Sequence, residues 1–281
     1  MTKAVGSIRL LVMISVHQWL ALPWMTSLPG CFVLESSASS AFSFSVTPNS
    51  NVPPTPRREI VCADAIAWMR ARGRIDGACA VTSLPDVSEV GKTLPVWREW
   101  FSGAVRLVVD AVPADSAALF FQSDIKRDGA WIDKGALVIR AAEDAGARVL
   151  FHKIVCRRPP GMLTQGRPGF THLIAVSRAM ACPDILPIPD VITDAGRSLW
   201  VRAMGVRAAA HAVRFARDQV HAKLIFDPFC GVGTIPAVAN ALGLDALGIE
   251  LAKKRCEQSR MQSVTAADWE GEIVKTENRE I

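Results

Sequence analysis

The stretch KLIFDPFCGVGTIPAVANALGLDALGIELAKKRC (residues 223–256) contains an apolar strand, a turn with two glycines, a helix and a second strand. The first strand ends at Asp227, the glycines are Gly231 and Gly233, and the second strand ends at Glu250. In such a turn, backbone N–H groups and the positive end of the helix dipole point at one place. Glycine also lets a ligand approach the backbone closely. The stretch therefore predicts an anion-binding site beside a doubly wound sheet.

The spacing of this turn excludes the common nucleotide-binding turns. Gly231 and Gly233 match the first two glycines of the dinucleotide fingerprint G-x-G-x-x-G, but Pro236 occupies the third position. Proline fits the first turn of a helix, and its presence argues against NAD or FAD. This turn also lacks the P-loop sequence G-K-[ST]. Glu250 can accept hydrogen bonds from both hydroxyls of a ribose. A ligand with a carboxylate near the helix start and a ribose near Glu250 fits S-adenosyl-L-methionine.

Two short motifs carry a family resemblance. FDPFCGVGT (226–234) resembles the Asp-Pro-Phe-x-Gly-x-Gly-Thr motif of amino-methylating DNA methyltransferases and related RNA enzymes, and LGIEL (247–251) resembles their next motif. The resemblance implies an S-adenosyl-L-methionine cofactor and the following cofactor-binding residues: Asp227, Phe229, Gly231, Gly233, Thr234 and Glu250. Asp64, which ends the strand VCAD, matches the acid that contacts the adenine amino group in such enzymes. An N-cap role for Asp64 is the compatible alternative.

From Arg58 onward, strand and helix patterns alternate, which predicts an α/β fold with a mostly parallel sheet and helices on both faces. The seven predicted strands are 59–64, 77–82, 116–124, 147–156, 171–177, 223–227 and 246–250. The predicted helices lie around 66–71 and at 94–112, 132–145, 198–220, 234–242 and 251–265. The fourth and fifth strands lack a helix between them, so we expect one antiparallel hairpin at an edge.

The late position of the glycine turn resembles circularly permuted DNA methyltransferases of the N4-cytosine or N6-adenine type. In these enzymes the catalytic loop precedes the cofactor turn. Read cyclically, 223–227 becomes the first strand of the Rossmann-like methyltransferase sheet, 246–250 the second, and 59–64 the third. The resemblance covers about 58–265. We therefore expect a methyltransferase domain at 57–266 and a tail at 267–281.

The loop VTSLPD (81–86) resembles the catalytic loop of this family only in part. The permuted N4-cytosine enzymes have Thr-Ser-Pro-Pro-Tyr, so Thr82, Ser83 and Pro85 match, Leu84 replaces a proline and Asp86 stands at the aromatic position. The resemblance implies that this loop accepts hydrogen bonds from the target amine, and we assign Ser83, Pro85 and Asp86 as catalytic. The divergent position Asp86 can accept a proton or hydrogen bond, or alternatively cap a turn or helix.

No tyrosine occurs in the chain to restore the stacking ring of this loop. Trp97 and Trp100 can form an aromatic wall, although their helical spacing favours core packing. Methyl transfer from a sulfonium requires in-line positioning and no metal, and no metal-ligand cluster is expected. The chain has no Pro-Cys pair, so the C5-cytosine mechanism is set aside.

The charge pattern favours an anionic partner. Hydrophobic residues make up 50% of the chain and charged residues 21%, which indicates a globular protein. The formal net charge is +5, a mild excess of positive charge. No acid occurs between Asp144 and Asp184, and basic residues recur in the segments 148–178 and 197–223. Phosphate neutralisation requires such one-signed surfaces. We therefore expect nucleic acid to bind these two segments.

The first 56 residues differ from the rest. Basic Lys3 and Arg9 precede an apolar run too short to span a membrane, and a serine-rich stretch follows. We expect a disordered extension or a targeting segment here. Seven scattered cysteines without a C-x-x-C pair predict reduced thiols, and so an intracellular location, whether cytoplasmic, nuclear or mitochondrial.

These observations predict an S-adenosyl-L-methionine-dependent methyltransferase acting on a base nitrogen of DNA or RNA. Two alternatives stay open at this point. The missing aromatic residue favours a small molecule or a protein as substrate, and the divergent catalytic loop favours a non-catalytic cofactor-binding scaffold. The target base and the oligomeric state are left open.

Overall fold

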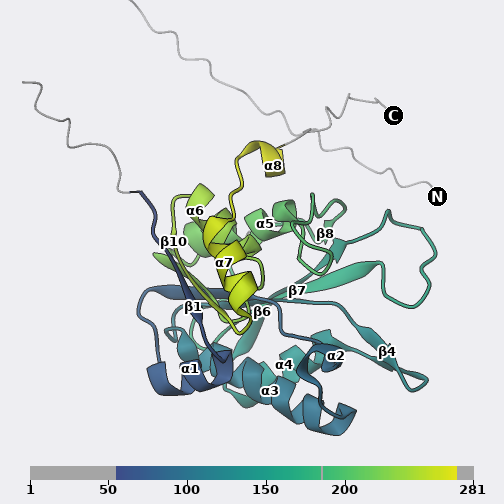
Figure 1. The fold of residues 1–281 in the computed structure, drawn as a ribbon. Helices are drawn as coiled ribbons and strands as arrows, with labels where there is room; N and C mark the ends of the chain where they lie inside the picture. The colour runs from purple at the N-terminus through teal and green to yellow at the C-terminus, as the bar shows by residue number, and fades with distance from the viewer. Residues whose placement is uncertain (1–54, 185, 271–281) are drawn as a thin grey trace, which may run out of the picture. The chain divides into compact units, whose positions relative to one another are not determined.

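The computed structural model describes residues 55–184 and 186–270, so the predicted extension 1–56 lies almost wholly outside the described residues. An eight-stranded sheet forms the centre of the fold (Figure 1). In spatial order its strands are β1 (Arg58–Cys62), β10 (Asp245–Glu250), β9 (Leu224–Asp227), β2 (Ala78–Thr82), β3 (Ala118–Gln122), β7 (Phe170–Ser177), β6 (Arg148–Cys156) and β8 (Val191–Ile192). The strand of the glycine turn, β9, thus lies inside the sheet, between β10 and β2.

The strand directions confirm a mostly parallel α/β sheet with one antiparallel hairpin. β7 runs antiparallel to both β3 and β6, whereas the other neighbours in the sheet pair in parallel. The predicted count of seven strands is corrected to eight. The additional strand, β8, pairs with β6 through Val191 and Ile192 only, so β8 and not the predicted hairpin forms this edge of the sheet. Two residues are too short to show a strand periodicity, which is why the sequence did not reveal it.

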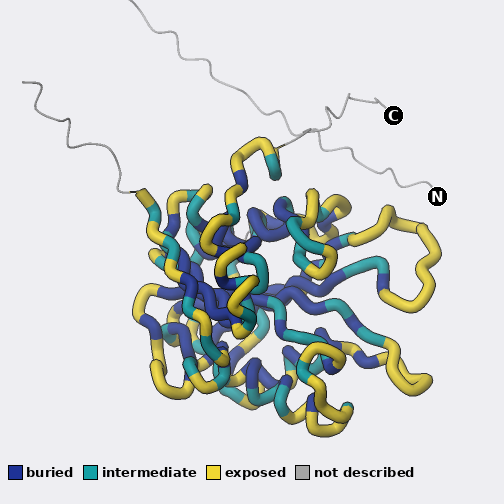
Figure 2. Tube along the Cα trace, viewed as in Figure 1, coloured by how far each residue is buried: buried dark blue, intermediate teal, exposed yellow. Residues whose placement is uncertain are grey.

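Helices cover both faces of the sheet in two layers (Figure 1). The helices are α1 (Ala65–Arg72), α2 (Val87–Val90), α3 (Leu94–Ala111), α4 (Lys134–Asp144), α5 (Val206–Asp218), α6 (Thr234–Ala241), α7 (Lys253–Met261) and α8 (Ala267–Glu270). Alternate residues of β3 separate the two cores, because Leu119 and Phe121 pack with α5 and α6 while Ala118 and Phe120 pack with α3 and α4. Figure 2 shows the buried residues concentrated along the sheet.

The predicted helix at 198–220 begins later than expected. Gly205 precedes α5, which starts at Val206, and a Cβ on Gly205 would lie 2.0 Å from the carbonyl oxygen of Ala195. The chain before α5 therefore packs tightly against an irregular segment, and only glycine fits at that contact. Helical spacing upstream of Gly205 could not reveal this tertiary constraint.

A small hairpin was missing from the prediction. Strands β4 (Ile125–Arg127) and β5 (Ala130–Ile132) form a separate two-stranded sheet. Asp128 and Gly129 connect them with positive φ angles of 50° and 76°. An Asp-Gly pair between two short strands is a strong hairpin signal, so the sequence did contain the information.

The start of the predicted tail, 267–281, is helical in the described region. Helix α8 packs against α5, and its Trp269 is buried. The domain boundaries at 57 and 266 remain predictions. Among residues 55–184 and 186–270, no helix combines the length and the apolar character needed to cross a bilayer. The six cysteines of these ranges are all free thiols.

The core on the α3 side generates a stability prediction. Phe101 is fully buried in α3 and its ring centroid lies 5.0 Å from that of Trp97, whereas the nearby Val96 is 47% exposed. Phe101→Ala removes a buried ring and leaves a cavity, so we expect the free energy of unfolding to fall by about 3–5 kcal/mol. Denaturant titration measures this change. Val96→Ala in the same helix should leave the midpoint nearly unchanged, and equal losses in both variants would contradict the assignment of the core.

Candidate cofactor and catalytic site

The glycine turn is fixed to the neighbouring strand. The N–H of Cys230 donates to the carbonyl oxygen of Ile249 in β10 (3.0 Å), and the N–H of Gly233 donates to the carbonyl oxygen of Cys230 (2.8 Å). Gly231 and Gly233 both have left-handed φ angles, 55° and 87°. This conformation strains residues with a Cβ, which explains the two glycines.

The two glycines of the turn have different surroundings. A Cβ on Gly233 would lie 2.3 Å from the Oγ and 2.8 Å from the Cα of Ser259, so Gly233 is required for α7 to pack on the turn. A Cβ on Gly231 would have no neighbour within 4 Å. Gly231 instead lines an open cavity. The first glycine is therefore free to contact a ligand, and the second holds the turn in the fold.

A cavity of about 600 Å³ lies over this turn. Eight of the ten residues assigned from the sequence line it: Asp64, Ser83, Pro85, Asp227, Phe229, Gly231, Thr234 and Glu250. Gly233 and Asp86 are the two that do not. The fold thus brings the cofactor motifs near the C-terminus together with segments that come more than a hundred residues earlier in the chain.

Asp227 connects the cofactor turn to the catalytic loop. Its side chain is buried, at 2% exposure, and its Oδ1 accepts a hydrogen bond from the Oγ1 of Thr82 (2.7 Å). The same oxygen accepts from the N–H of Phe229 (3.2 Å). Burial raises the pKa of Asp227 to about 7, opposed by these two hydrogen bonds and reinforced by the nearby charge of Glu250. Asp227 therefore orders the turn as well as lining the cavity.

Glu250 is held at the cavity wall by its own turn. Its Oε1 accepts from the N–H of Ala252 (2.8 Å) and lies 3.8 Å from a guanidinium nitrogen of Arg255. Arg255 in turn lies over the ring of Trp200, 4.8 Å from the ring centroid. Trp200 and Arg255 both line the cavity, and neither was assigned from the sequence. No local motif marks Trp200, because it reaches the site from a loop distant in sequence.

The other assigned wall of the cavity contains Asp64 and aromatic rings. The Oδ1 of Asp64 accepts from the N–H of Ala67 (2.7 Å), so Asp64 caps α1 while also lining the cavity. The ring of Trp100 contacts the ring of Phe229 edge-on at 6.1 Å, and both line the cavity. Trp97 is instead fully buried. Of the two tryptophans considered for an aromatic wall, Trp100 therefore occupies the wall and Trp97 the core.

The catalytic-loop residues lie where two cavities meet. A second cavity, of about 480 Å³, shares four lining residues with the first, namely Ser83, Arg202, Ala203 and Met204. Of the three residues assigned as catalytic, Ser83 lines both cavities and Pro85 lines only the first. The carbonyl oxygen of Pro85 accepts from the Nε1 of Trp97 (3.3 Å). This contact fixes the loop against the core, and Ser83 is the catalytic-loop side chain that faces both spaces.

Asp86 has the contacts of a structural residue. It is the N-cap of α2, and its N–H donates to the carboxylate of Glu89 (2.9 Å). Its Oδ1 accepts a short hydrogen bond from the Nζ of Lys134, whose side chain is almost fully buried. These contacts are those of the capping alternative. The role of Asp86 as a proton acceptor stays a prediction.

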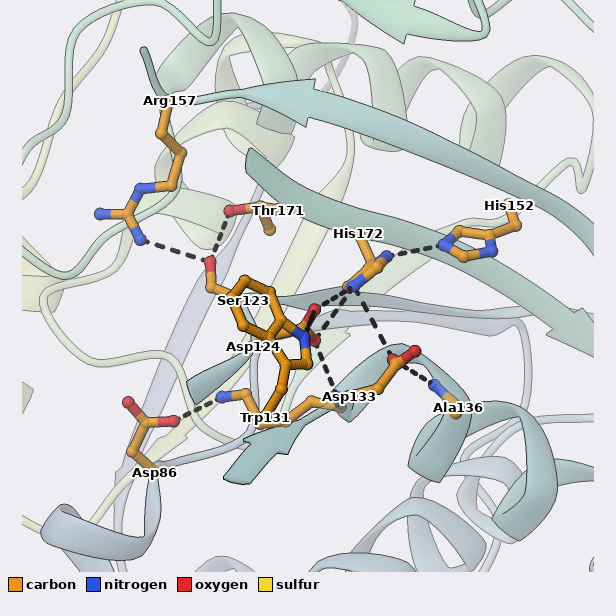
Figure 3. Close-up of polar contacts among 11 residues, drawn as sticks. Asp86, Ser123, Asp124, Trp131, Asp133, Ala136, His152, Arg157, Thr171 and His172 are labelled. Carbon is orange, nitrogen blue, oxygen red and sulfur yellow. Dashed lines mark hydrogen bonds and ion pairs between the residues drawn. The ribbon is translucent and has the colours of Figure 1, made fainter. Parts of the chain in front are cut away.

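A hydrogen-bond network lies beside the second cavity (Figure 3). Buried Asp124 accepts from the N–H of Lys134 (2.8 Å), the Nε1 of Trp131 (3.0 Å) and the Nε2 of His172 (3.1 Å). The Nδ1 of His172 lies 2.8 Å from the Nε2 of His152. Asp124, His172 and Asp133 offer ligand atoms within 4.8 Å of one another, which is close enough for a metal ion. Asp124 already accepts three donors, so hydrogen bonds hold its carboxylate in this position.

The basic segments differ in how their charges are paired. In 197–223 five arginines form ion pairs: Arg197 with Asp268, Arg202 with Glu89, Arg207 with Asp194, Arg214 with Glu270, and Arg217 with Asp218. Four of these acids lie outside the segment, and Asp218 lies within it. The segment is therefore much less one-signed in space than in sequence. In 148–178, Lys153 pairs with Asp190 and Arg178 pairs with Asp110. The arginines of the loop 157–169 form no ion pair in the described residues.

Comparison with known proteins gave one family and several structures. Residues 219–261 match the family model of N6- and N4-type DNA methylases, described as DNA methylase. No curated protein sequence matched the chain significantly. A proposed DNA modification methylase from Thermus thermophilus is similar in structure, with a TM-score of 0.58 and 15% identity over 77% of this chain and 97% of that chain. Its complex with S-adenosyl-L-methionine gives a TM-score of 0.56 and 16% identity over 73% and 93%.

A third similar structure is the cytosine-N4-specific PvuII DNA methyltransferase, with a TM-score of 0.62 and 12% identity over 75% of this chain and 88% of that chain. At these identities the structures establish the fold alone. The family match contains the glycine turn and Glu250. It confirms the predicted resemblance to amino-methylating DNA methyltransferases. With it, the predicted enzyme class, an S-adenosyl-L-methionine-dependent methyltransferase, and the predicted cofactor are confirmed.

The two glycines of the turn should respond differently to alanine. Gly233→Ala adds a Cβ that overlaps Ser259, so we expect a loss of stability larger than the about 1–2 kcal/mol of left-handed strain alone. Gly231→Ala should lower the free energy of unfolding by about 1–2 kcal/mol, the left-handed strain alone, and should weaken binding of S-adenosyl-L-methionine. Thermal unfolding and calorimetric titration measure the two effects. Normal cofactor affinity in folded Gly231→Ala would contradict the place given to the ligand.

Asp227 should make stability depend on pH. Its folded pKa is about 7 and its ordinary value is 3.8, so the folded chain binds the extra proton between these values. The free energy of unfolding therefore falls as pH rises from about 4 to about 7. Asp227→Asn should remove this contribution, so the difference between wild type and variant changes across that window. Asp76→Asn, at an exposed position, is the control, and parallel pH profiles of wild type and Asp227→Asn would refute the assignment.

Proposed function

We propose that this chain transfers a methyl group from S-adenosyl-L-methionine to an amino nitrogen of a base in DNA. The observation that carries the proposal is the position of Ser83. It lines the cavity over the glycine turn and also the adjoining second cavity. A cofactor in the first space and a nucleotide in the second would meet at this side chain. The relatives named DNA methyltransferases support DNA as the substrate.

The residues of the first cavity fit the cofactor. The Oγ1 of Thr234 is buried at the start of α6 and has no hydrogen-bond partner among the described residues. An anionic group at this helix end would accept from that hydroxyl and from turn N–H groups, as the cofactor's carboxylate requires. Glu250 would accept from ribose hydroxyls, and Asp64 from the adenine amino group. Gly231 leaves room for close approach to the backbone.

When bound, the cofactor supplies a methyl group activated by its positive sulfur. The Ser83 hydroxyl would accept a hydrogen bond from the target amine, which directs the nitrogen lone pair toward the first cavity. Phe229 and Trp100 line the first cavity and restrict water there. Transfer to the amine would leave the electron pair of the broken carbon–sulfur bond on sulfur, and the amine would release one proton to solvent through the open second cavity. In this scheme the chain contributes mainly position and orientation.

The second cavity offers recognition without a stacking ring at the position of Asp86. Its lining includes Phe121 and the prolines Pro159 and Pro160. Polar groups around it include Ser123, Thr171 and Arg202, which can bond to base edges or to the sugar-phosphate. Methylation of a small molecule or a protein remains the alternative, because the usual aromatic residue is replaced by an ion-paired acid.

Circular permutation is part of the proposal. The spatial order β1-β10-β9-β2-β3-β7-β6 places the cofactor strand β9 beside β2, whose end begins the catalytic loop. This order supports a methyltransferase sheet in which the strand carrying the cofactor turn comes late along the chain. The edge strand β8 would be an addition to that sheet.

Ser83→Ala should reduce methyl transfer without loss of the cofactor site. We expect the rate of labelled methyl transfer to DNA to fall by about 10² or more, since one positioned polar group is removed. The affinity for S-adenosyl-L-methionine should change by less than about twofold, because the turn is untouched. Filter-binding of labelled DNA and calorimetry provide the two readouts.

Ser88→Ala is the matched control, since Ser88 is exposed on α2 a few residues away. Total RNA and protein are tested beside DNA. Undiminished transfer in Ser83→Ala would remove Ser83 from the mechanism. Label in RNA or protein but not in DNA would overturn the proposed substrate.

A further inference from the structure

The loop between β6 and β7, residues 157–169, is an ordered projection. Its two ends are joined, because the N–H groups of Arg157 and Arg158 donate to the carbonyl oxygen of Gly169 (2.7 and 3.1 Å). A second contact shapes the outer part, where the N–H of Met162 donates to the carbonyl oxygen of Pro159 (3.2 Å). Figure 1 shows the loop extending away from the sheet between β6 and β7. It presents a defined tip rather than covering the core.

The base of this loop carries three arginines that form no ion pair in the described residues. Arg157, Arg158 and Arg167 form no ion pair with a carboxylate in the described part of the chain, and Arg157 instead donates to the hydroxyl of Ser123 (3.3 Å). The pKa of Arg157 is lowered, first by desolvation and then by the charges of Arg167 and Arg158, and the charge of Asp86 opposes this lowering only in part. These guanidinium groups thus repel one another, and an anion would relieve that repulsion. The arginines of 197–223, by contrast, are ion-paired.

The tip of the loop is apolar and exposed. Leu163 is 96% exposed and its neighbour Met162 is 54% exposed. Figure 2 shows the whole outer loop as exposed. The described fold therefore leaves two adjacent apolar side chains largely uncovered at the end of a basic projection. Apolar residues flanked by phosphate-binding arginines are typical of side chains that insert between base steps of a duplex.

The loop is attached beside the proposed target site. Arg157, Arg158, Pro159 and Pro160 line the second cavity, which shares Ser83 with the first. Leu163 follows Pro160 by three residues, so it lies within about 10 Å of that rim along the chain. A base buried in a duplex must leave the stack to enter such a cavity, and its departure leaves a gap between its neighbours. The tip is therefore close enough to occupy a gap opened at the rim.

We propose that Leu163, with Met162, inserts into the base stack of duplex DNA and fills the space vacated by the target base, while Arg157, Arg158 and Arg167 bind the flanking phosphates. This inference rests on the proposed function. It adds a specific role: the loop tip opens the duplex and is unnecessary when the target strand is already single. Ser83 and the cofactor turn act equally on both substrates.

The test compares labelled methyl transfer to double-stranded DNA and to the same DNA after heat denaturation, at equal salt. In Met162→Ser/Leu163→Ser we expect transfer to the duplex to fall by about tenfold or more. The duplex must then be unstacked without the two inserting apolar side chains, which together form the wedge. Transfer to single strands should stay within about twofold of wild type. Met261→Ser, at another exposed apolar position at the end of α7, is the matched control.

The outcomes separate this inference from the proposed function. Loss on the duplex alone supports the wedge. Unchanged transfer to the duplex, or equal loss on both substrates, overturns it while wild-type transfer still stands. If wild type labels neither form of DNA, the proposed function itself fails, and the wedge fails with it.

Discussion

The site depends on one buried hydrogen bond, from the Oγ1 of Thr82 to the Oδ1 of Asp227. Thr82 ends β2 and precedes Ser83, while Asp227 ends β9 and precedes the glycine turn. The bond therefore joins the catalytic loop to the cofactor turn across neighbouring parallel strands. Because the carboxyl is buried, leaving it without this donor would be costly. The relative position of the two cavities is thus set inside the core, before any ligand binds.

Close backbone packing maintains the same geometry from the other side. Gly233 allows α7 to contact the turn through Ser259, and Gly248 in β10 allows Cys230 and Ile60 to approach it, since a Cβ there would lie 2.8 Å from each. These contacts leave Gly231 facing the cavity. The turn consequently has a rigid inner side that only glycine permits and an open outer side that can receive an anionic ligand.

The sequence brought together most of its assigned residues at the first cavity, and it marked few of those that line the second. Asp227 and Gly231 lie in one short motif and Glu250 in the next, so their spacing along the chain was enough to predict that they lie close together. Trp200 and the residues of the second cavity come from separate segments, and no local pattern marks their meeting. Charge counts also do not show pairing: the arginines of 197–223 form ion pairs with acids such as Asp268, Glu89 and Asp194. Only a folded chain distinguishes paired from unpaired charge. The longer strands and helices were clear from their periodicity, whereas β8 was too short to show a period.

The central claim is that methyl groups pass to an amino nitrogen of a DNA base at the junction marked by Ser83. The most direct measurement is mass analysis of nucleosides after DNA has been incubated with the protein and methyl-labelled S-adenosyl-L-methionine. The account predicts label in N4-methylcytosine or N6-methyladenine, and in neither after Ser83→Ala. Label in 5-methylcytosine, or none in any nucleoside while the cofactor still binds, would contradict it.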